Sequence, residues 1–281
     1  MSNSAEQTPI IEGRNLVKRF GGKKGLFQSA PTVHAVNNVS LSVMPGETFA
    51  IVGESGCGKS TLARLLLRLI EPTEGSVIYQ GRDITKLPAA EMRALRREMQ
   101  IIFQDPFASL NPRMTIGSII AEPIRLHGLA KGKDVDKRVA ELLQVVGLRP
   151  EYASRYPHEF SGGQRQRIGV ARALAGEPKL IIGDEPVSAL DVSIQAQVIN
   201  LLEDLKEQFG LTLIIVAHDL AVIRHMSDRV AVMYLGEVVE LAPVDPLYET
   251  PLHPYTQTLL DAIPVPVPGG KEKRALARGD I

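Results

Sequence analysis

The chain has 281 residues, of which 44% are hydrophobic, and its 32 Lys and Arg residues balance its 32 Asp and Glu residues. This composition is typical of a soluble globular protein, and the zero formal net charge gives no overall attraction to nucleic acid. A single cysteine excludes a disulfide within the chain, and it excludes a cysteine-rich zinc or iron–sulfur site built from this chain alone.

The apolar runs of the sequence are short. The longest, such as 211–217, fall well below the roughly 20 residues that a membrane-spanning helix needs. The polar start, residues 1–9, lacks the apolar core of a secretory signal. If the protein serves a membrane process, we therefore expect it to act from the cytoplasmic side and through a partner.

The N-terminal part is predicted to be rich in β-structure over residues 10–52. Residues 39–43 alternate apolar and polar side chains, and the apolar run 48–52 ends at a glycine. The glycine-rich stretch 21–25 predicts a loop within this part. The elements predicted next are a helix at 59–70, a strand at 77–79, a helix from Pro88 to about Met99, and a strand at 99–103.

Residues 105–160 differ in character, because they carry several prolines and two amphipathic stretches, 116–126 and 135–146. This pattern predicts a helical insert. The apolar runs 179–184 and 212–217 that follow suit strands buried on both faces of a parallel sheet. The alternation of strands and helices indicates the α/β fold class.

Between those two strands, residues 193–209 predict an amphipathic helix, and Gly210 fits its C-cap. Its apolar face comprises Ile194, Val198, Leu201, Leu202 and Leu205. The last thirty residues are rich in proline, and they predict an extended tail that ends in the stretch 264–270.

A glycine-rich loop between a predicted strand and a predicted helix fits the pattern G-x-x-x-x-G-K-S/T. Its residues are Gly53, Glu54, Ser55, Gly56, Cys57, Gly58, Lys59, Ser60 and Thr61. Backbone N–H groups of such a loop face a phosphate, and the helix N-terminus adds positive potential. Lys59 would reach the β- and γ-phosphates and Ser60 would bind Mg²⁺. We interpret Cys57 as a small packing residue rather than a nucleophile.

Two carboxylates end the apolar run 180–184. Asp184 is placed to hold the Mg²⁺ shell, and Glu185 is placed to polarise an attacking water. Following a phosphate-binding loop, they indicate the second half of a nucleotide site.

A further motif, residues 160–167, precedes an amphipathic helix about twenty residues before the acidic strand end. It resembles the Leu-Ser-Gly-Gly-Gln signature of the ATP-binding cassette (ABC) family, with Phe160 in place of Leu. The matching residues are Ser161, Gly162, Gly163 and Gln164. Ser161 would cap the helix, and the two glycines allow close backbone approach to a phosphate.

The resemblance extends along nearly the whole chain and implies further roles. It implies that Gln104 senses Mg²⁺ and the attacking water and links the site to transmembrane subunits. It implies that Asp191 belongs to a loop that crosses a dimer interface, and that His218 contacts the γ-phosphate. Phe20 stands where the family places an aromatic ring that stacks on adenine. The alternative, a Phe20 ring that packs in the core, stays open.

The family resemblance also implies the architecture and the cofactors. It implies a P-loop NTPase cassette with a RecA-like mixed-sheet core, an N-terminal antiparallel β region and a helical insert at about 105–175. The cassette would span 8–250, followed by a tail at 251–281. ATP and Mg²⁺ would bind between two cassettes packed head to tail, identical or paralogous, with one chain's phosphate loop facing the partner's signature.

The stretches 103–112, 186–197 and 253–260 resemble the oligopeptide/dipeptide importer ATPases, a group that also serves glutathione and nickel. The resemblance implies an ATP-hydrolysing subunit at the cytoplasmic face of the inner membrane that energises import of peptides or a related small solute. Its partners would be two transmembrane permease subunits and, indirectly, an extracytoplasmic solute-binding protein, with no nucleic acid. Many members carry a cysteine cluster; this chain does not, so we predict no iron–sulfur centre.

Two other classes stay open. One is a soluble ABC ATPase that is not coupled to transport, although the chain shows neither long coiled coils nor a second cassette. The other is an exporter cassette cut from a fused membrane protein, against which the polar N-terminus and the 253–260 stretch argue.

The segment 104–112 carries a prediction of its own. We expect it and the helices after it to form a groove that receives a cytoplasmic helix of each permease, with Phe107 and Leu110 as exposed apolar side chains. The alternative, that both side chains close the insert's own core, stays open.

Overall fold

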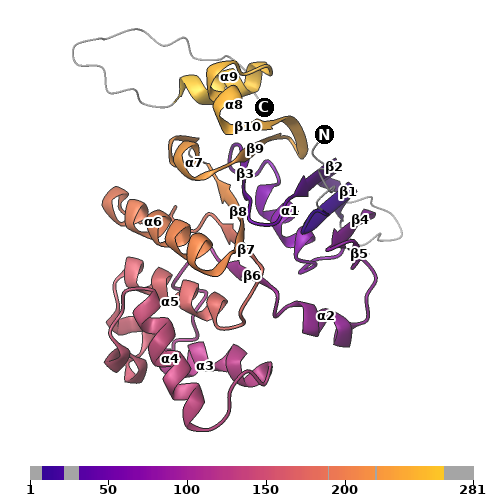
Figure 1. Ribbon diagram of the computed structural model, residues 1–281. Coiled ribbons are helices and arrows are strands. Elements are labelled where there is room, and N and C mark those ends of the chain that lie inside the picture. The colour runs from indigo at the N-terminus through magenta and orange to yellow at the C-terminus, as the bar shows by residue number, and fades with distance from the viewer. Residues whose placement is uncertain (1–7, 22–31, 189, 219, 263–281) are drawn as a thin grey trace, which may run out of the picture.

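The computed structural model describes residues 8–21, 32–188, 190–218 and 220–262 (Figure 1). The predicted loop at 21–25 lies outside these residues except for Gly21, which ends a strand. The predicted tail at 264–270 and Ala189, two residues before Asp191, lie outside them too.

Two sheets organise the chain. The first is antiparallel, and its strands in spatial order are β2 (Thr32–Val43), β1 (Ile11–Gly21), β4 (Glu74–Tyr79) and β5 (Arg82–Asp83). The second contains, in spatial order, β10 (Glu237–Pro243), β9 (Arg229–Tyr234), β3 (Thr48–Val52), β8 (Thr212–Ala217), β7 (Leu180–Asp184) and β6 (Met99–Ile102). Its strands from β9 to β6 are parallel, and β10 is antiparallel to β9. The mixed sheet and the antiparallel β region confirm the predicted fold class.

Helices connect the strands and form the helical part of the chain. They are α1 (Lys59–Leu66), α2 (Ala89–Leu95), α3 (Ile116–Leu126), α4 (Lys133–Val145), α5 (Gly162–Leu174), α6 (Val192–Phe209), α7 (Leu220–Met226), α8 (Val244–Glu249) and α9 (Pro254–Asp261), with short 3₁₀ turns at Pro150–Ser154 and Pro157–Glu159. In the described parts of the chain, no helix combines the length and the apolar character that a bilayer crossing requires.

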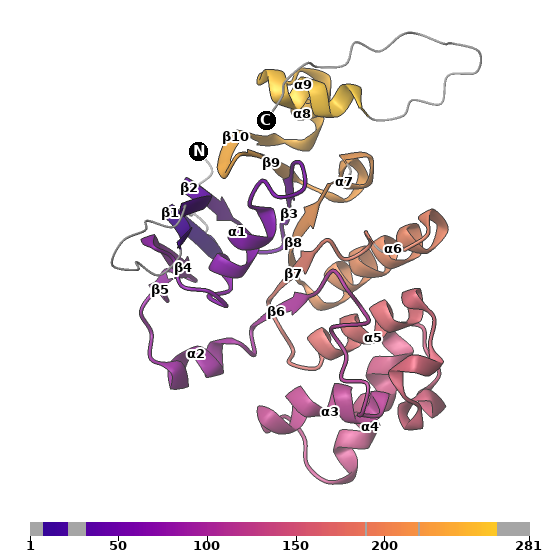
Figure 2. The same ribbon diagram turned by 180° about the vertical axis from the view of Figure 1, so that it is seen from behind.

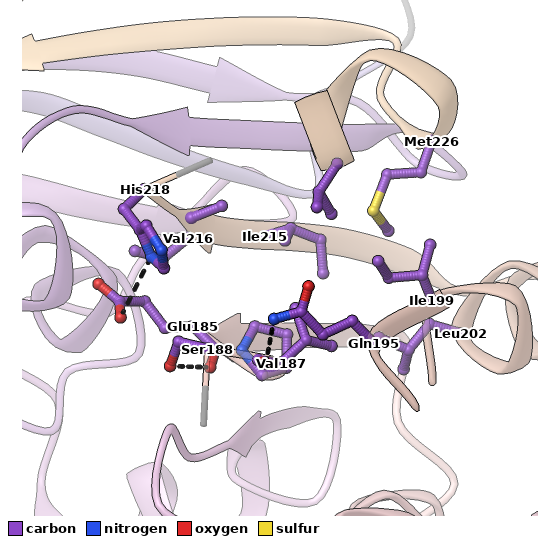
Figure 3. Close-up of a pocket in the computed structure, with 13 residues that line it drawn as sticks. Glu185, Val187, Ser188, Gln195, Ile199, Leu202, Ile215, Val216, His218 and Met226 are labelled. Carbon is purple, nitrogen blue, oxygen red and sulfur yellow. Dashed lines mark hydrogen bonds and ion pairs between the residues drawn. The ribbon is translucent and has the colours of Figure 1, made fainter. Parts of the chain in front are cut away.

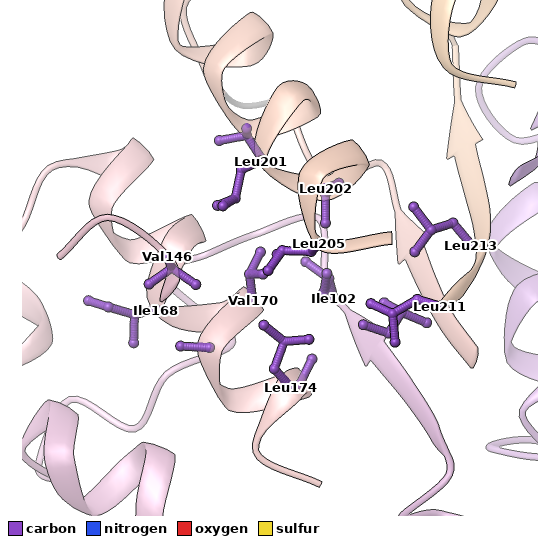
Figure 4. Packing of buried hydrophobic residues seen from close by; sticks show 14 of the residues in the cluster. Ile102, Val146, Ile168, Val170, Leu174, Leu201, Leu202, Leu205, Leu211 and Leu213 are labelled. Atoms are coloured by element: carbon purple, nitrogen blue, oxygen red, sulfur yellow. The ribbon is translucent and has the colours of Figure 1, made fainter. Parts of the chain in front are cut away.

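The pleat of the central strands divides the core into two. On β3, Phe49 and Ile51 pack in one cluster with α1 and the antiparallel sheet, whereas Ala50 and Val52 pack in another with α5 and α6. Successive side chains of a strand point to opposite faces, so one buried strand serves both clusters. The predicted α6 face is confirmed: Figure 4 shows Leu201, Leu202 and Leu205 of α6 packed near Val170 and Leu174 of α5.

Residues 103–179 form no strand, and α3 and α4 lie at the opposite end of the molecule from α8 and α9 in both ribbon views (Figures 1 and 2). This agrees with the predicted helical insert, and α3 begins and ends at the predicted residues. The unit boundaries at 8–250 and 251–281 stay predictions.

Three expectations differ from the structure. The helix predicted at 59–70 ends at Leu66, because the chain turns at Arg68, which has a left-handed φ of 49°. The helix predicted from Pro88 to Met99 covers only α2, and Pro88 caps it with ψ of 150° instead of joining it. The predicted extended tail is wrong for 254–261, which form α9, since Pro254 is compatible with the first turn of a helix.

Candidate nucleotide site

Four adjacent parallel strands end at one edge of the second sheet. The phosphate loop follows β3, and Gln104 lies two residues after the end of β6. Asp184 ends β7, and His218 follows β8 directly. Ligands of open α/β sheets bind outside the carboxyl ends of the strands. The order β3–β8–β7–β6 therefore brings residues from four separate parts of the sequence to one place.

The phosphate loop is held tightly against its neighbours at two glycines. A Cβ atom on Gly53, which has φ of 147°, would lie 2.2 Å from the Met233 carbonyl oxygen. One on Gly58, with φ of 111°, would lie 2.1 Å from the Ala35 carbonyl oxygen. Only glycine fits both the conformation and the space. The loop therefore reaches the start of α1 at Lys59 by a path that no other residue type permits.

Lys59 carries a charge into the loop. Its Nζ donates to the carbonyl oxygens of Gly53 at 2.7 Å and Glu54 at 2.8 Å, and the residue is only 3% exposed. Among the residues that the structure describes, no carboxylate lies within ion-pair distance of it. A buried charge without a counter-ion is costly, and an anionic ligand removes that cost. The loop therefore fits a phosphate group.

Of the three residues predicted at the Mg²⁺ site, Ser60, Gln104 and Asp184, two touch each other, and Gln104 instead bonds to Glu185. The Ser60 hydroxyl donates to Asp184 Oδ1 at 2.6 Å, and Asp184 is 2% exposed. The Arg64 guanidinium lies 3.5 Å from the other oxygen, Oδ2. Mg²⁺ takes one or two protein oxygens and completes its shell with phosphate and water. One hydroxyl and one carboxylate beside the phosphate loop therefore fit this ion.

Glu185 is the point where three strand ends converge. Its Oε2 accepts a hydrogen bond from Gln104 Nε2 at 2.8 Å and lies 3.8 Å from His218 Nδ1. The residue has a left-handed φ of 48°, and its N–H donates to the Val216 carbonyl at 3.0 Å. A left-handed conformation is costly for a glutamate and persists where the surroundings enforce it, as at functional sites. The structure thus brings all three predicted catalytic residues together.

A cavity of about 40 Å³ lies behind Glu185 and His218, between the ends of β7 and β8 and the helices α6 and α7 (Figure 3). Its walls are mostly apolar and include Val187, Ile215 and Met226. Pockets that hold ligands are roughly 300–1,000 Å³ in volume, whereas a water needs only about 10–15 Å³. The cavity therefore has room for water beside the carboxylate but not for a nucleotide.

The signature residues begin α5. The Ser161 hydroxyl accepts the Gln164 N–H at 3.3 Å, and the Gln164 side chain accepts the Ser161 N–H at 3.1 Å. This capping box satisfies two free N–H groups, and it confirms that Ser161 caps the helix. However, α5 belongs to the core cluster on one face of the sheet, and α1 to the cluster on the other face. Within the described part of the chain, no hydrogen bond joins Ser161–Gln164 to the phosphate loop.

The remaining predicted site residues lie apart from Glu185. The Phe20 ring, near the end of β1, is 45% exposed, with Lys18 Nζ 5.1 Å from its centroid, so the core alternative is wrong. Asp191 is exposed at the N-cap of α6. Cys57 is buried, and burial raises the pKa of its thiol, which agrees with a packing role.

Phe107 and Leu110 of the segment 104–112 were both expected to be exposed, but only Phe107 is. Phe107 is 60% exposed and carries the Arg165 guanidinium 3.9 Å from its ring centroid. Leu110 is 2% exposed and packs in the core cluster with α3 and α5. The expectation is therefore wrong for Leu110, which closes the core of the insert.

One residue at the site was missed. The hydroxyl of Tyr255, on α9, accepts the Glu54 backbone N–H at 3.0 Å, so the C-terminal region contacts the phosphate loop. The two residues are 201 positions apart, and no local sequence pattern reports a contact at that range.

Comparison with known proteins supports the motifs. Residues 36–188 match a family model described as ABC transporter, and residues 239–280 match one described as oligopeptide/dipeptide transporter, C-terminal region. The chain is 54% identical over 282 residues to the oligopeptide transport ATP-binding protein AppF of Bacillus subtilis (strain 168), covering 99% of this chain and 86% of AppF. It is 55% identical over 275 residues to the glutathione import ATP-binding protein GsiA of Escherichia coli (strain K12), covering 97% of this chain. The chain spans 44% of the length of GsiA.

Solved structures of ABC cassettes have the same fold as this chain. A dimeric post-hydrolysis state of the ATP-binding cassette MJ0796, bound to ADP and Pi, superposes with a TM-score of 0.73 at 32% identity, covering 83% of this chain and 98% of that one. CbiO1 of Clostridium perfringens, part of the transporter complex CbiONQ, superposes with a TM-score of 0.73 at 26% identity, covering 86% of this chain and 91% of that one.

Proposed function

The chain belongs to the ABC transporter family, and from that premise we propose that it hydrolyses ATP to energise the import of peptides or a related small solute. The observation that supports the proposal most strongly is that Gln104 and His218 both lie against Glu185. The Glu185 carboxylate accepts a hydrogen bond from the Gln104 amide and lies beside His218, at the edge of the sheet that bears the phosphate loop. The names of AppF and GsiA support import of an oligopeptide or of glutathione.

The geometry supports a division of labour in hydrolysis. Lys59 neutralises phosphate charge at the loop, and Ser60 and Asp184 hold the metal ion. Mg²⁺, when bound, neutralises charge on the phosphates as the γ-phosphoryl group transfers. Glu185 orients the attacking water and accepts its proton, because a carboxylate within hydrogen-bond reach acts as a general base. Gln104 and His218 fix the orientation of that carboxylate, Gln104 also senses Mg²⁺ and the attacking water, and His218 contacts the γ-phosphate.

The separation of the two nucleotide-binding loops supports a dimer. The phosphate loop and Ser161–Gln164 belong to helices on opposite faces of the sheet, so one chain supplies only part of the shell around an ATP. A second cassette, packed head to tail, would bring its signature to this chain's loop, with Asp191 at the interface. The exposed Phe20 would stack on adenine. The dimeric state of the similar cassette MJ0796 supports this arrangement.

A surface beside α3 supports the permease partner. An open depression of about 720 Å³ lies there. It is lined by Arg113, Met114, Thr115, Ser118, Glu122, Arg125, Leu126 and Tyr156. The exposed Leu126 and Tyr156 line it together with the charged Arg113, Glu122 and Arg125, a mixture that suits an amphipathic helix. Through two permeases the cassette would sit at the cytoplasmic face of the inner membrane and act with an extracytoplasmic solute-binding protein.

The second candidate is an ABC ATPase that is not coupled to transport. The match of residues 239–280 to the C-terminal region of oligopeptide/dipeptide transporters favours the importer.

Co-expression with the two permease subunits tests the function. We expect the complex to purify as a unit, to hydrolyse ATP and to drive uptake. Glu185→Gln should keep ATP affinity and accumulate an ATP-bound dimer, yet lose at least about 100-fold in turnover, the usual contribution of a general base. Glu207→Gln, the same change on the exposed side of α6, is the matched control. Hydrolysis at the wild-type rate in Glu185→Gln would contradict the assignment, and an active cassette that never binds permeases would favour the uncoupled ATPase.

A further inference from the structure

The C-terminal helix lies against the phosphate loop. Besides the bond from the Glu54 N–H to the Tyr255 hydroxyl, the Tyr255 ring centroid lies 4.4 Å from that of Tyr234, at the end of β9. The turn after Tyr234 also touches the loop, because the Gly236 N–H donates to the Cys57 carbonyl at 2.9 Å. The phosphate loop, the β9–β10 turn and α9 thus form one continuous contact.

The start of α9 is anchored by a second set of bonds. The Glu240 carboxylate on β10 accepts the backbone N–H groups of Leu252 at 2.9 Å and His253 at 3.0 Å. His253 Nδ1 then accepts the Tyr255 N–H at 3.2 Å and caps the helix. Three backbone N–H groups that precede or begin the helix are therefore satisfied. The backbone that carries the Tyr255 ring is therefore anchored to β10, which belongs to the same sheet as β3, the strand before the phosphate loop.

The bond to Tyr255 acts on one particular peptide unit. The Glu54 N–H and the Gly53 carbonyl belong to the same peptide bond, which is planar and trans, so the two groups point in opposite directions. Tyr255 accepts the N–H, and Lys59 Nζ donates to the carbonyl at 2.7 Å. Rotation of this peptide would break both bonds at once. The hydroxyl and the ammonium therefore hold the first peptide of the loop from its two sides.

We propose that Tyr255 is a positioning residue for the phosphate loop, which fixes the Gly53–Glu54 peptide and through it the ammonium of Lys59. The proposal rests on the proposed function, since the loop is taken to bind ATP. It gives the C-terminal region a role in nucleotide affinity, and any displacement of α9 would be felt at Lys59. Burial raises the pKa of Tyr255 to about 12, so the hydroxyl keeps its proton across the neutral range and the contact does not titrate there.

Tyr255→Phe is the test, because it removes the acceptor and keeps the ring on Tyr234. Thr258→Val is the matched control, because it removes from the same helix a hydroxyl that donates to the Pro254 carbonyl at 3.1 Å. In the purified full chain with Mg·ATP, we expect Tyr255→Phe to raise the KM and Kd for ATP about 3- to 10-fold, as for one lost hydrogen bond, with kcat unchanged. The control should match wild type.

A second measurement follows the loop directly. Without nucleotide, amide exchange at Glu54 should be faster in Tyr255→Phe and unchanged in Thr258→Val, while both keep the wild-type Tm. Equal ATP affinity and equal Glu54 exchange in the two variants would overturn the inference alone. A fall in kcat and Tm together, with KM unchanged, would also overturn it, since that is the signature of a merely structural role. A wild-type chain that binds no ATP would overturn the proposed function and this inference with it.

Discussion

At the scale of single residues, one carboxylate oxygen links the loops of the site. Glu185 Oε2 accepts the Gln104 amide and lies beside His218, so its orientation depends on the ends of β6 and β8 as well as its own strand. Under the proposed mechanism, movement of either neighbour would turn the carboxylate away from the attacking water. Hydrolysis would then depend on the position of Gln104, which lies in the segment that leads to the helical insert.

Lys59 gives a prediction at the same scale. Lys59→Met keeps the length and apolar stem of the side chain but removes the charged donor, and we expect ATP to bind about 10- to 100-fold more weakly, as for a lost charge-assisted hydrogen bond. Because the protein buries this charge without a carboxylate partner among the residues described, its Tm should not fall. Lys133→Met, at an exposed position of α4, is the control. Calorimetric titration with Mg·ATP measures the effect, and unchanged affinity would remove Lys59 from the phosphate site.

At the scale of elements, two arginines tie the signature helix to the segment after β6. Arg165 of α5 stacks on Phe107, and Arg172 donates to the Ser109 carbonyl at 2.6 Å and lies 5.9 Å from the Phe103 ring centroid. Burial lowers the pKa of the Arg172 guanidinium, which marks how closely it is packed. The segment 103–110 and α5 therefore move together, so a permease bound at the segment would also displace the signature.

That segment offers a matched pair of substitutions. Phe107→Asp changes an exposed side chain, so the isolated chain should stay folded and hydrolyse ATP slowly, yet fail to co-purify with its permeases. Leu110→Asp places a charge in the core and should unfold the insert, since loss of a buried leucine alone costs about 2–5 kcal/mol. Tm and co-purification separate the two effects. A Phe107→Asp chain that assembles and transports normally would refute docking at this side chain.

Much of the fold was predictable from periodicity alone. The strands β3 and β8 begin and end as predicted, or within one residue, because both their faces are buried and the apolar runs stop where burial stops. The amphipathic α6 and the C-cap Gly210, with φ of 62°, follow from the same kind of pattern. The candidate site residues could be predicted from the sequence because they follow the ends of predicted strands.

The features that were not predicted depend on contacts between distant parts of the chain. The helix α9 begins at Pro254 only because His253 caps it and Glu240, on another element, holds the preceding N–H groups. Leu110 was expected at the surface because its neighbours are prolines and loop residues, and its burial depends on α3 and α5. The contact between Tyr255 and Glu54 joins residues 201 positions apart, which no local pattern encodes.

At the scale of the whole molecule, the sheet separates two loops that, in the proposed site, bind one nucleotide together. The phosphate loop opens α1 on one face, and the signature opens α5 on the other. The residues between them are core side chains packed on both faces of the sheet, and a close-packed core does not rearrange to bring the loops together. Completion of the site by a second chain, as proposed above, would leave both folds intact and would make the relative motion of two cassettes the mechanical output of hydrolysis.

This arrangement predicts complementation between two inactive variants. Ser161→Arg should block hydrolysis by steric and electrostatic obstruction of the partner's site while its own phosphate loop still binds ATP. Ser161→Ala controls for the lost helix cap, which costs about 0.5–2 kcal/mol of local stability. A dimer that pairs one Ser161→Arg chain with one Lys59→Met chain contains one site with both loops intact and one with both loops altered.

We therefore expect the mixed dimer, isolated with two different affinity tags, to recover hydrolysis while each variant paired with itself stays inactive. If the native dimer pairs paralogues, the two substitutions are placed one in each chain, and exchanging them should move the working site to the other ATP. Were the sites formed within single chains, the mixed dimer would remain as inactive as its parents, because neither chain would then hold two intact loops. Recovery in the mixed dimer, against none in the parents, is a result that only a site shared between two chains produces.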